Sequence, residues 1–283
     1  MQVKGRSILV TGGGSGIGAG VAKELADAGA KVTIVGRNAE RLGQVADSLG
    51  AGVLAHAADV TDEDQVAGAV VAAVAHGGRL DGVVACAGGN ETIGPITQID
   101  TAAWRRTVEL NLTGTMLTLK HAAPQLVAAG GGSFVGISSI AASNTHRWFG
   151  AYGPSKLGME MLLKGAADEL GASNIRVNGI RPGLTRTDLV QVITAGGPIL
   201  EDYQESTPLP RIGEVEDIAA LAAFLLGDKS TWITGQIINV DGGQNLRRGP
   251  DFTSMLEPAF GAAGLRGAVA GQAGGWSSSA ESN

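Results

Sequence analysis

The sequence has one cysteine, Cys86, among its 283 residues, and only 4% of its residues are aromatic. A single cysteine excludes an intrachain disulfide and is typical of a protein in a reducing cytoplasm. The longest uncharged apolar run, 66–75, falls well short of the roughly 20 residues that a membrane-spanning helix needs, and no signal peptide is visible. We therefore expect a soluble cytoplasmic protein with no membrane partner.

Basic charge is also scarce, because 21 Lys and Arg face 27 Asp and Glu for a net charge of −6. An acidic balance argues against nucleic acid as the main partner. No group of His, Cys and carboxylates has the spacing of metal ligands, so no metal site is expected.

Glycine, in contrast, is abundant, with 45 residues, and several glycines follow directly after the first apolar run. Five of the eight residues in 11–18 are glycine, after which Ile17, Val21 and Leu25 recur at helical spacing. A strand, a glycine turn and a helix N-terminus form an anion site, because backbone N–H groups and the helix dipole attract a pyrophosphate. This context favours a nucleotide site over a simple turn, with six expected contacts: Gly12, Gly14, Ser15, Gly16, Ile17 and Gly18.

The rest of the chain alternates between strand-like and helix-like segments. Apolar β-forming runs predict strands at 8–10, 31–35, 53–58, 82–86, 133–138, 175–180 and 236–240. Helices are predicted after the glycines and at 38–49, from Thr61 with Asp64 completing a capping box, from Asp100 to about Ala128, at 152–170 and at 214–226. This alternation predicts an α/β fold, a doubly wound parallel sheet whose ligands bind at the carboxyl ends of its strands.

The residues at the end of the second predicted strand indicate whether the cofactor is NAD(H) or NADP(H). NAD-binding folds usually place an acid there to bind the ribose 2′-OH, but this chain has Arg37, which could pair with a 2′-phosphate. NADP(H) is therefore favoured, although Arg37 could instead be a solvated residue at a helix start. Asp59 suits an adenine amino group or a helix approach, and Val60 would pack on the ring.

Tyr152 and Lys156 are four residues apart, so they share one face of the helix predicted at 152–170. A nearby ammonium should lower the pKa of the tyrosine and make it a usable acid or base. Ser139 ends a strand at the same edge of the sheet, where its hydroxyl could hold a substrate oxygen. Its neighbour Ser138 is the alternative.

Together these motifs resemble the classical short-chain dehydrogenases/reductases. They are TGxxxGxG from Thr11, NLTG from Asn111, Ser139, YxxxK at Tyr152 and Lys156, Arg181-Pro-Gly, and NVDGG ending at Gly243. The resemblance spans residues 5–243. It implies a single Rossmann-like domain (1–243) with a seven-stranded sheet, a nicotinamide cofactor and a homotetramer or homodimer.

The resemblance also implies residue roles. Tyr152 would transfer the hydroxyl proton, Lys156 would hold the nicotinamide ribose, and Ser139 would orient the reacting oxygen. Asn111 would lie at a helix break, with its exposed carbonyl holding a water that links Lys156 to solvent. Further cofactor contacts are expected at Ala87, Gly88, Pro182, Gly183, Thr185 and Thr187, the last one on the carboxamide. Cys86 departs from the family's Asn-Asn-Ala-Gly pattern and is expected to pack as a small hydrophobe rather than act as a redox centre.

Substrate specificity is expected to lie in loops. Trp148 and Phe149 suggest an apolar substrate wall or an oligomer contact, whereas His146 is expected to be a solvated loop residue. The segment 184–211 is expected to be a mobile lid. We hypothesise that residues 244–260 lie across the pocket mouth, in which case truncation after Gly243 should change the substrate KM; residues 261–283 resemble a flexible tail.

The sequence thus predicts an oxidoreductase that moves a hydride between NADP(H) and a carbonyl or secondary alcohol, with Asn111, Ser139, Tyr152 and Lys156 as its catalytic residues. Trp148 and Phe149 are the additional substrate contacts. An NAD(H)-dependent alcohol dehydrogenase of the same fold and a cofactor-sensing protein without turnover are the alternatives. The substrate itself is not named by the sequence.

Overall fold

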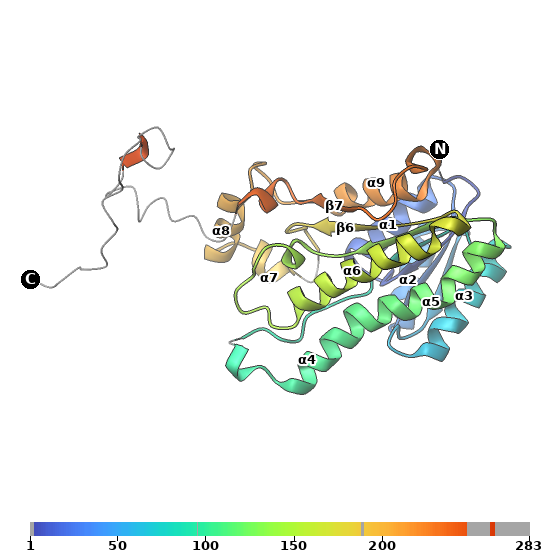
Figure 1. Ribbon diagram of the computed structural model, residues 1–283, viewed down its shortest axis with the longest axis horizontal. Coiled ribbons are helices and arrows are strands. Elements are labelled where there is room, and N and C mark those ends of the chain that lie inside the picture. The colour runs from blue at the N-terminus through green and yellow to red at the C-terminus, as the bar shows by residue number, and fades with distance from the viewer. Residues whose placement is uncertain (1–2, 95, 188–189, 248–260, 264–283) are drawn as a thin grey trace, which may run out of the picture.

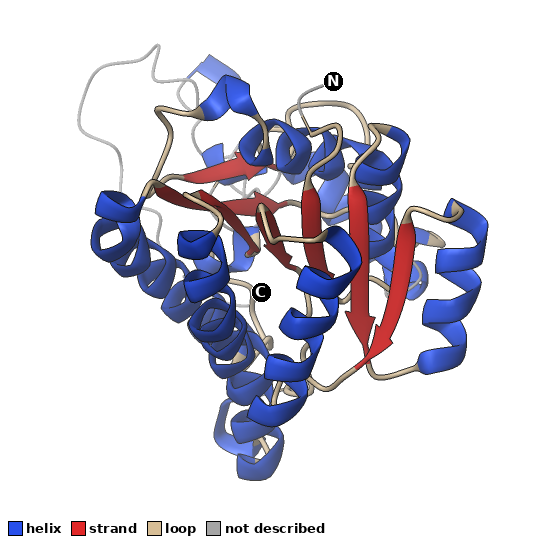
Figure 2. Ribbon diagram, turned by 90° about the vertical axis from the view of Figure 1, so that its right-hand side faces the viewer, coloured by secondary structure: helices blue, strands red, loops and turns tan. Residues whose placement is uncertain are grey.

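The computed structural model describes residues 3–94, 96–187, 190–247 and 261–263. In this part of the chain seven parallel strands form one sheet, in the order β3-β2-β1-β4-β5-β6-β7 (Figure 2). They are β1 (Ser7–Thr11), β2 (Lys31–Gly36), β3 (Val53–Ala57), β4 (Gly82–Ala85), β5 (Gly132–Ile137), β6 (Ile175–Pro182) and β7 (Ile237–Val240). The predicted doubly wound, seven-stranded Rossmann-like fold is confirmed.

Helices cover both faces of this sheet (Figure 1). On one face lie α1 (Gly16–Asp27), α2 (Ala39–Leu49) and α9 (Val215–Leu226), and on the other α3 (Glu63–Gly77), α5 (Gly114–Ala128) and α6 (Tyr152–Leu170). Shorter helices are α4 (Thr101–Val108), α7 (Gln191–Thr194) and α8 (Pro198–Ser206), with single turns η1 (Ile96–Gln98), η2 (Glu109–Thr113), η3 (Ile140–Ala142), η4 (Gly171–Ser173), η6 (Asp228–Ser230) and η7 (Gln244–Leu246).

The hydrophobic core lies in two layers, one on each face of the sheet. Every residue of β1 and β4 is buried, because these central strands are covered on both sides. Alternating side chains of a strand therefore enter different layers, so that Val10 packs toward α1 and Leu9 toward α3. The burial fixes the strand register, and with it the loops at the carboxyl edge.

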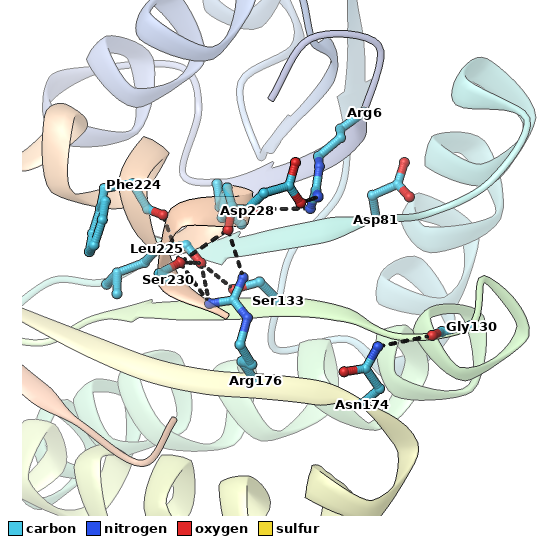
Figure 3. Close-up of polar contacts among 12 residues, drawn as sticks. Arg6, Asp81, Gly130, Ser133, Asn174, Arg176, Phe224, Leu225, Asp228 and Ser230 are labelled. Atoms are coloured by element: carbon cyan, nitrogen blue, oxygen red, sulfur yellow. Dashed lines mark hydrogen bonds and ion pairs between the residues drawn. The ribbon is translucent and has the colours of Figure 1, made fainter. Parts of the chain in front are cut away.

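At the opposite edge of the sheet two arginines cap the C-terminal end of α9 (Figure 3). The Arg176 guanidinium donates to the carbonyls of Leu225 at 2.7 Å and Gly227 at 3.2 Å, and Arg6 donates to the carbonyl of Leu226 at 2.9 Å. Ser230 donates to the carbonyl of Phe224 at 2.7 Å. The last carbonyls of α9 therefore accept hydrogen bonds from side chains. Two of these side chains are cationic, and their charge interacts favourably with the negative end of the helix dipole.

Two helix predictions can be compared with the observed boundaries. The prediction of a capping box that begins at Thr61 is wrong. The N-cap of α3 is Asp62, whose carboxylate accepts from the N–H of Gln65, and the Thr61 hydroxyl donates to Asp59 at 2.8 Å instead. The break in the long helical region is confirmed at Asn111, where the π-helical turn η2 separates α4 from α5. Among the described helices, none has both the length and the apolar character that a membrane crossing requires.

Candidate active site

A cavity of about 600 Å³ opens at the carboxyl edge of the sheet. Nineteen of the predicted site residues line it, from the glycine loop to Thr187. Two predicted residues, Asn111 and Trp148, are not among its lining. A second hollow of about 490 Å³ lies between α8 and the end of β7, and it contains none of the predicted site residues.

The glycine loop follows β1 and crosses close to the end of β4. Gly12 has a φ of +68°, and a Cβ there would lie 2.9 Å from the Ala87 nitrogen, so no other residue fits without a backbone shift. Ser15 is the N-cap of α1, yet its side chain makes no capping hydrogen bond. The first N–H groups of this helix are therefore available to a ligand, and the loop fits the diphosphate of a dinucleotide.

At the end of β2 the cavity is lined by two arginines. Its lining there consists of Gly36, Arg37, Asn38 and Arg41, none of which carries a carboxylate. The Asn38 side chain accepts from the Arg41 N–H at 2.9 Å and so caps α2. Arg41 was missed by the sequence analysis, although its position one turn after Arg37 could have indicated it.

Ser138 and Ser139 follow β5 and have different partners. The Ser138 hydroxyl donates to the Glu160 carboxylate at 2.6 Å, whereas the Ser139 hydroxyl lies beside that of Tyr152 and acts to lower the pKa of Tyr152. Ser139 also accepts from the Ala141 N–H at 3.1 Å, which fixes its orientation. Of the two serines left open by the sequence, Ser139 is the one beside Tyr152.

Tyr152 and Lys156 lie on the first turns of α6, as predicted, but their electrostatics differ from the prediction. The expectation that Lys156 lowers the pKa of Tyr152 is wrong here, because burial raises that pKa and only the neighbouring Ser139 hydroxyl opposes it. The Lys156 ammonium donates to the Ile137 carbonyl at 2.8 Å and lies 5.9 Å from the centre of the Tyr152 ring. Burial lowers the pKa of Lys156 to about 8.

Asn111 is buried next to the cavity but is not among its lining residues. Its amide accepts from the Gly89 N–H at 2.9 Å, and donates to the Gly89 carbonyl at 2.8 Å and to the Ser155 hydroxyl at 2.9 Å. The predicted exposed carbonyl is not found, because Asn111 is fully buried and its carbonyl accepts from the Thr115 hydroxyl. In this structure Asn111 joins η2 and α6 to the loop after β4.

Cys86 lines the cavity and packs against the apolar core, as predicted. Burial raises the pKa of its thiol to about 11, which leaves it an uncharged thiol near neutral pH. The Thr11 hydroxyl accepts from the N–H groups of Cys86 and Ala87 at 3.1 and 3.2 Å. Thr11 therefore links β1 to the end of β4 without an asparagine at position 86.

The loop 143–151 forms the far wall of the cavity. Phe149 lines it, as expected, but Trp148 is 53% exposed outside it, with the Arg147 guanidinium 4.9 Å above its ring. His146, expected to be a solvated loop residue, lines the cavity and is half-buried. Trp148 has a φ of +72°, which separates its direction from that of Phe149 in a way that sequence does not reveal.

The loop that contains residues 90–94 forms hydrogen bonds with the main chain of the loop 143–151. The Asn90 amide donates to the Phe149 carbonyl at 3.3 Å, the Thr92 hydroxyl accepts from the Ala151 N–H at 2.9 Å, and the Gly94 N–H donates to the Trp148 carbonyl at 2.8 Å. These positioning residues were also missed, because nothing in the sequence indicates that the two loops meet. Tyr203 from α8 completes the wall.

Comparisons with known proteins agree with this geometry. The sequence model of a family described as Enoyl-(Acyl carrier protein) reductase matches residues 12–245. The chain is 40% identical over 241 residues to a cis-4-hydroxycyclohexanecarboxylate dehydrogenase of Sinomonas cyclohexanicum, covering 84% of this chain and 96% of that protein. A short-chain type dehydrogenase/reductase from Mycobacterium ulcerans has a solved structure that is 60% identical, with a TM-score of 0.87 over 95% of this chain and all of the other.

The chain belongs to the short-chain dehydrogenase/reductase family. It is similar to a 7α-hydroxysteroid dehydrogenase of Escherichia coli, with 36% identity over 86% of this chain and 95% of that protein. A solved 7α-hydroxysteroid dehydrogenase complexed with NADH and 7-oxo glycochenodeoxycholic acid is 34% identical with a TM-score of 0.80, over 86% of this chain and 95% of the other. As a short-chain dehydrogenase/reductase, the protein is an NAD(P)-dependent oxidoreductase acting on CH–OH and C=O groups.

Parts of the predicted site fall outside the described residues of this short-chain dehydrogenase/reductase. Residues 248–260, expected at the pocket mouth, and most of the tail 261–283 belong to that group. The described residues of the expected lid, 184–211, include α7 and α8. Within the described ranges no group of three or more His, Cys, Asp and Glu side chains is arranged to hold a metal ion.

The buried Lys156 leads to a pH-dependent stability. Its pKa is about 8 in the folded protein and ordinarily 10.5, so between these pH values the unfolded chain binds the extra proton and the fold gains stability as pH rises. Relative to Lys156→Met, the wild type should gain about 3 kcal/mol in free energy of unfolding across this window. Urea unfolding of both cofactor-free proteins at several pH values measures it, and a pH-independent difference would contradict the lowered pKa.

Proposed function

We propose that the protein is an NADP(H)-dependent reductase of ketones on apolar rings, and that the same site oxidises the corresponding secondary alcohols. The observation that carries the proposal is the pair of neighbouring hydroxyls on Ser139 and Tyr152, which line one largely apolar cavity together. The ring substrate is supported by two relatives named for hydroxyl groups on cyclohexane and steroid rings.

Tyr152 is the proton donor in the reducing direction. Burial raises its pKa, so the phenol keeps its proton until the carbonyl oxygen of the substrate gains negative charge. Ser139 lies beside the Tyr152 hydroxyl, and it would donate to the same oxygen and stabilise the developing charge. In the oxidising direction Tyr152 must first lose its own proton, and its phenolate would then accept the proton of the alcohol.

Lys156 and Asn111 support this step from behind. The Lys156 ammonium donates to the Ile137 carbonyl one helical turn after Tyr152, where it can also bind a ribose hydroxyl. Asn111 braces the loop of Gly88 and Gly89 against α6, because its amide binds both Gly89 and Ser155.

The cofactor cradle supports a nicotinamide dinucleotide phosphate. The bound nicotinamide supplies or accepts the hydride. The N–H groups at the start of α1 would bind the diphosphate, and Arg37 and Arg41 would bind the 2′-phosphate. Asp59 and Val60 would contact the adenine. The nicotinamide end would be held by Ala87, Gly88, Pro182, Gly183, Thr185 and Thr187. Two arginines and no carboxylate at the end of β2 favour NADP(H) over NAD(H).

Fluorescence titration with NADPH and NADH tests the cofactor. Wild-type protein should bind NADPH at least about tenfold more tightly than NADH, because each charge-assisted arginine bond to phosphate contributes about 1.5–3 kcal/mol. Arg37→Ser should remove most of this preference through weaker NADPH binding, while NADH affinity, which involves no 2′-phosphate, serves as the internal control.

Other outcomes point to the alternatives. Tighter NADH binding by the wild type would contradict the NADP(H) assignment and favour an NAD(H)-dependent alcohol dehydrogenase, in line with the relative solved with NADH. Binding without oxidation of NADPH by a panel of cyclic ketones would favour a sensor.

A further inference from the structure

We infer that His146 determines specificity by accepting a hydrogen bond from a second hydroxyl group of the substrate, placed across an apolar ring from the reacting carbon. The inference rests on the proposed function and names the substrate class more closely. It concerns the half of the cavity beyond Tyr152, where the loop 143–151 and α8 form the wall.

The hydrogen bonding of His146 defines its tautomer. Its Nδ1 lies 3.0 Å from the Asn144 carbonyl oxygen, and because a carbonyl only accepts, Nδ1 must carry a proton. Asn144 is itself held, since its amide donates to the Arg247 carbonyl at 3.0 Å. In the neutral imidazole Nε2 is then an acceptor, and it has no partner among the described residues.

The ring of His146 is held in place by its neighbours. It packs against Phe149 with ring centres 5.2 Å apart and against Tyr203 at 6.1 Å. Phe149 in turn meets the Tyr152 ring edge-on at 6.2 Å, whereas His146 has no ring contact with Tyr152 in the described structure. The acceptor therefore stands one aromatic ring away from the proton donor, and Phe149 offers the surface on which a substrate ring can lie.

Asn90, another polar residue of the cavity lining, is already engaged. The Asn90 oxygen accepts from the N–H and hydroxyl of Thr92, and its amide donates to the Phe149 carbonyl. Of the charged side chains among the described lining residues, Arg37, Arg41 and Asp59 lie at the cofactor end, and Lys156 is bonded to Ile137. A free acceptor on an apolar wall suits a neutral hydroxyl and disfavours a carboxylate, which has no proton to donate.

The test compares three cyclic ketones reduced with NADPH: 4-hydroxycyclohexanone, 4-methylcyclohexanone and 4-oxocyclohexanecarboxylate. The wild type should have about a tenfold higher kcat/KM for the hydroxyl compound than for the methyl compound, because a methyl group displaces water from Nε2 without offering it a donor. A preference for the carboxylate over the hydroxyl compound would overturn the inference.

Two variants separate the acceptor from the shape of the loop. His146→Asn keeps a donor near the Nδ1 position and lacks the acceptor, so the hydroxyl-to-methyl preference should fall to below about twofold. His146→Gln places an amide near the Nε2 position and should retain most of the preference. Loss of the preference in both variants, or in neither, would contradict a role for Nε2.

A binding measurement distinguishes failure of this inference from failure of the proposed function. In NADP⁺-loaded Tyr152→Phe protein, calorimetry should show tighter binding of cyclohexane-1,4-diol than of 4-methylcyclohexanol, and His146→Asn should abolish the difference. Reduction of the ketones without such selectivity would overturn the inference alone, whereas selective binding without reduction in the wild type would overturn the proposed function alone.

Discussion

Tyr152→Phe should lower kcat for ketone reduction by about 10²- to 10⁴-fold, because the variant loses the positioned proton donor. Phenylalanine keeps the ring that contacts Phe149 edge-on, so the wall of the cavity should survive. The affinity for NADPH, measured by fluorescence, should change little relative to the loss in kcat.

The chain offers a matched comparison, since Tyr203 is its other tyrosine and lines the same cavity. Tyr203→Phe removes the same atom from a residue that has no hydrogen bond to Ser139 among the described contacts, and its kcat should fall less than about tenfold. Equal losses in the two variants would contradict the assignment of Tyr152 as the donor.

Arg181→Met should destabilise the fold by about 3–5 kcal/mol, because it leaves the Glu160 carboxylate unpaired in the interior. Glu160 is 1% exposed, and its oxygens accept from Arg181 at 2.6 and 2.5 Å and from Ser138 at 2.6 Å. The Glu160–Arg181 ion pair links α6, at a position one turn after Lys156, to the end of β6. Urea unfolding monitored by circular dichroism measures the loss.

Two further variants make this prediction specific. Glu160→Leu combined with Arg181→Met removes both charges and should recover most of the stability, as buried pairs often contribute little net free energy. Arg211→Met breaks a two-bond pair with Asp217, at 2.6 and 2.8 Å, that is much more exposed, and it should cost far less stability than Arg181→Met. Equal effects of Arg181→Met and Arg211→Met would contradict the role of burial.

The sheet could be predicted from sequence because its signals are local. Apolar runs such as 8–10 and 31–35 alternate with helical periodicity, and parallel strands place their loops on one edge, so nearly all predicted site residues line the same cavity. The break at Asn111 was also predictable, although from the resemblance rather than from helix propensity.

Features that depend on tertiary contacts could not be predicted in this way. The sign of the pKa shift of Tyr152 follows from its burial, which a spacing of four residues to Lys156 does not report. His146 lines the cavity while Trp148, with a φ of +72°, lies outside it, and Arg41 enters the site through the close approach of α2 to the glycine loop. These features belong to loops and packing, where sequence patterns are weak.

The contacts behind the loop 143–151 bear on how this protein could be given new substrates. Asn90, Thr92 and Gly94 bind the main chain at positions 148, 149 and 151 rather than any side chain. Gly150 is constrained as well, since a Cβ there would lie 2.5 Å from the Thr92 carbonyl oxygen. The side chain of Phe149 takes no part in these bonds, so a library at position 149 can vary the substrate range while the bonds that hold the loop stay in place, whereas a change at position 146 also removes the bond to the Asn144 carbonyl.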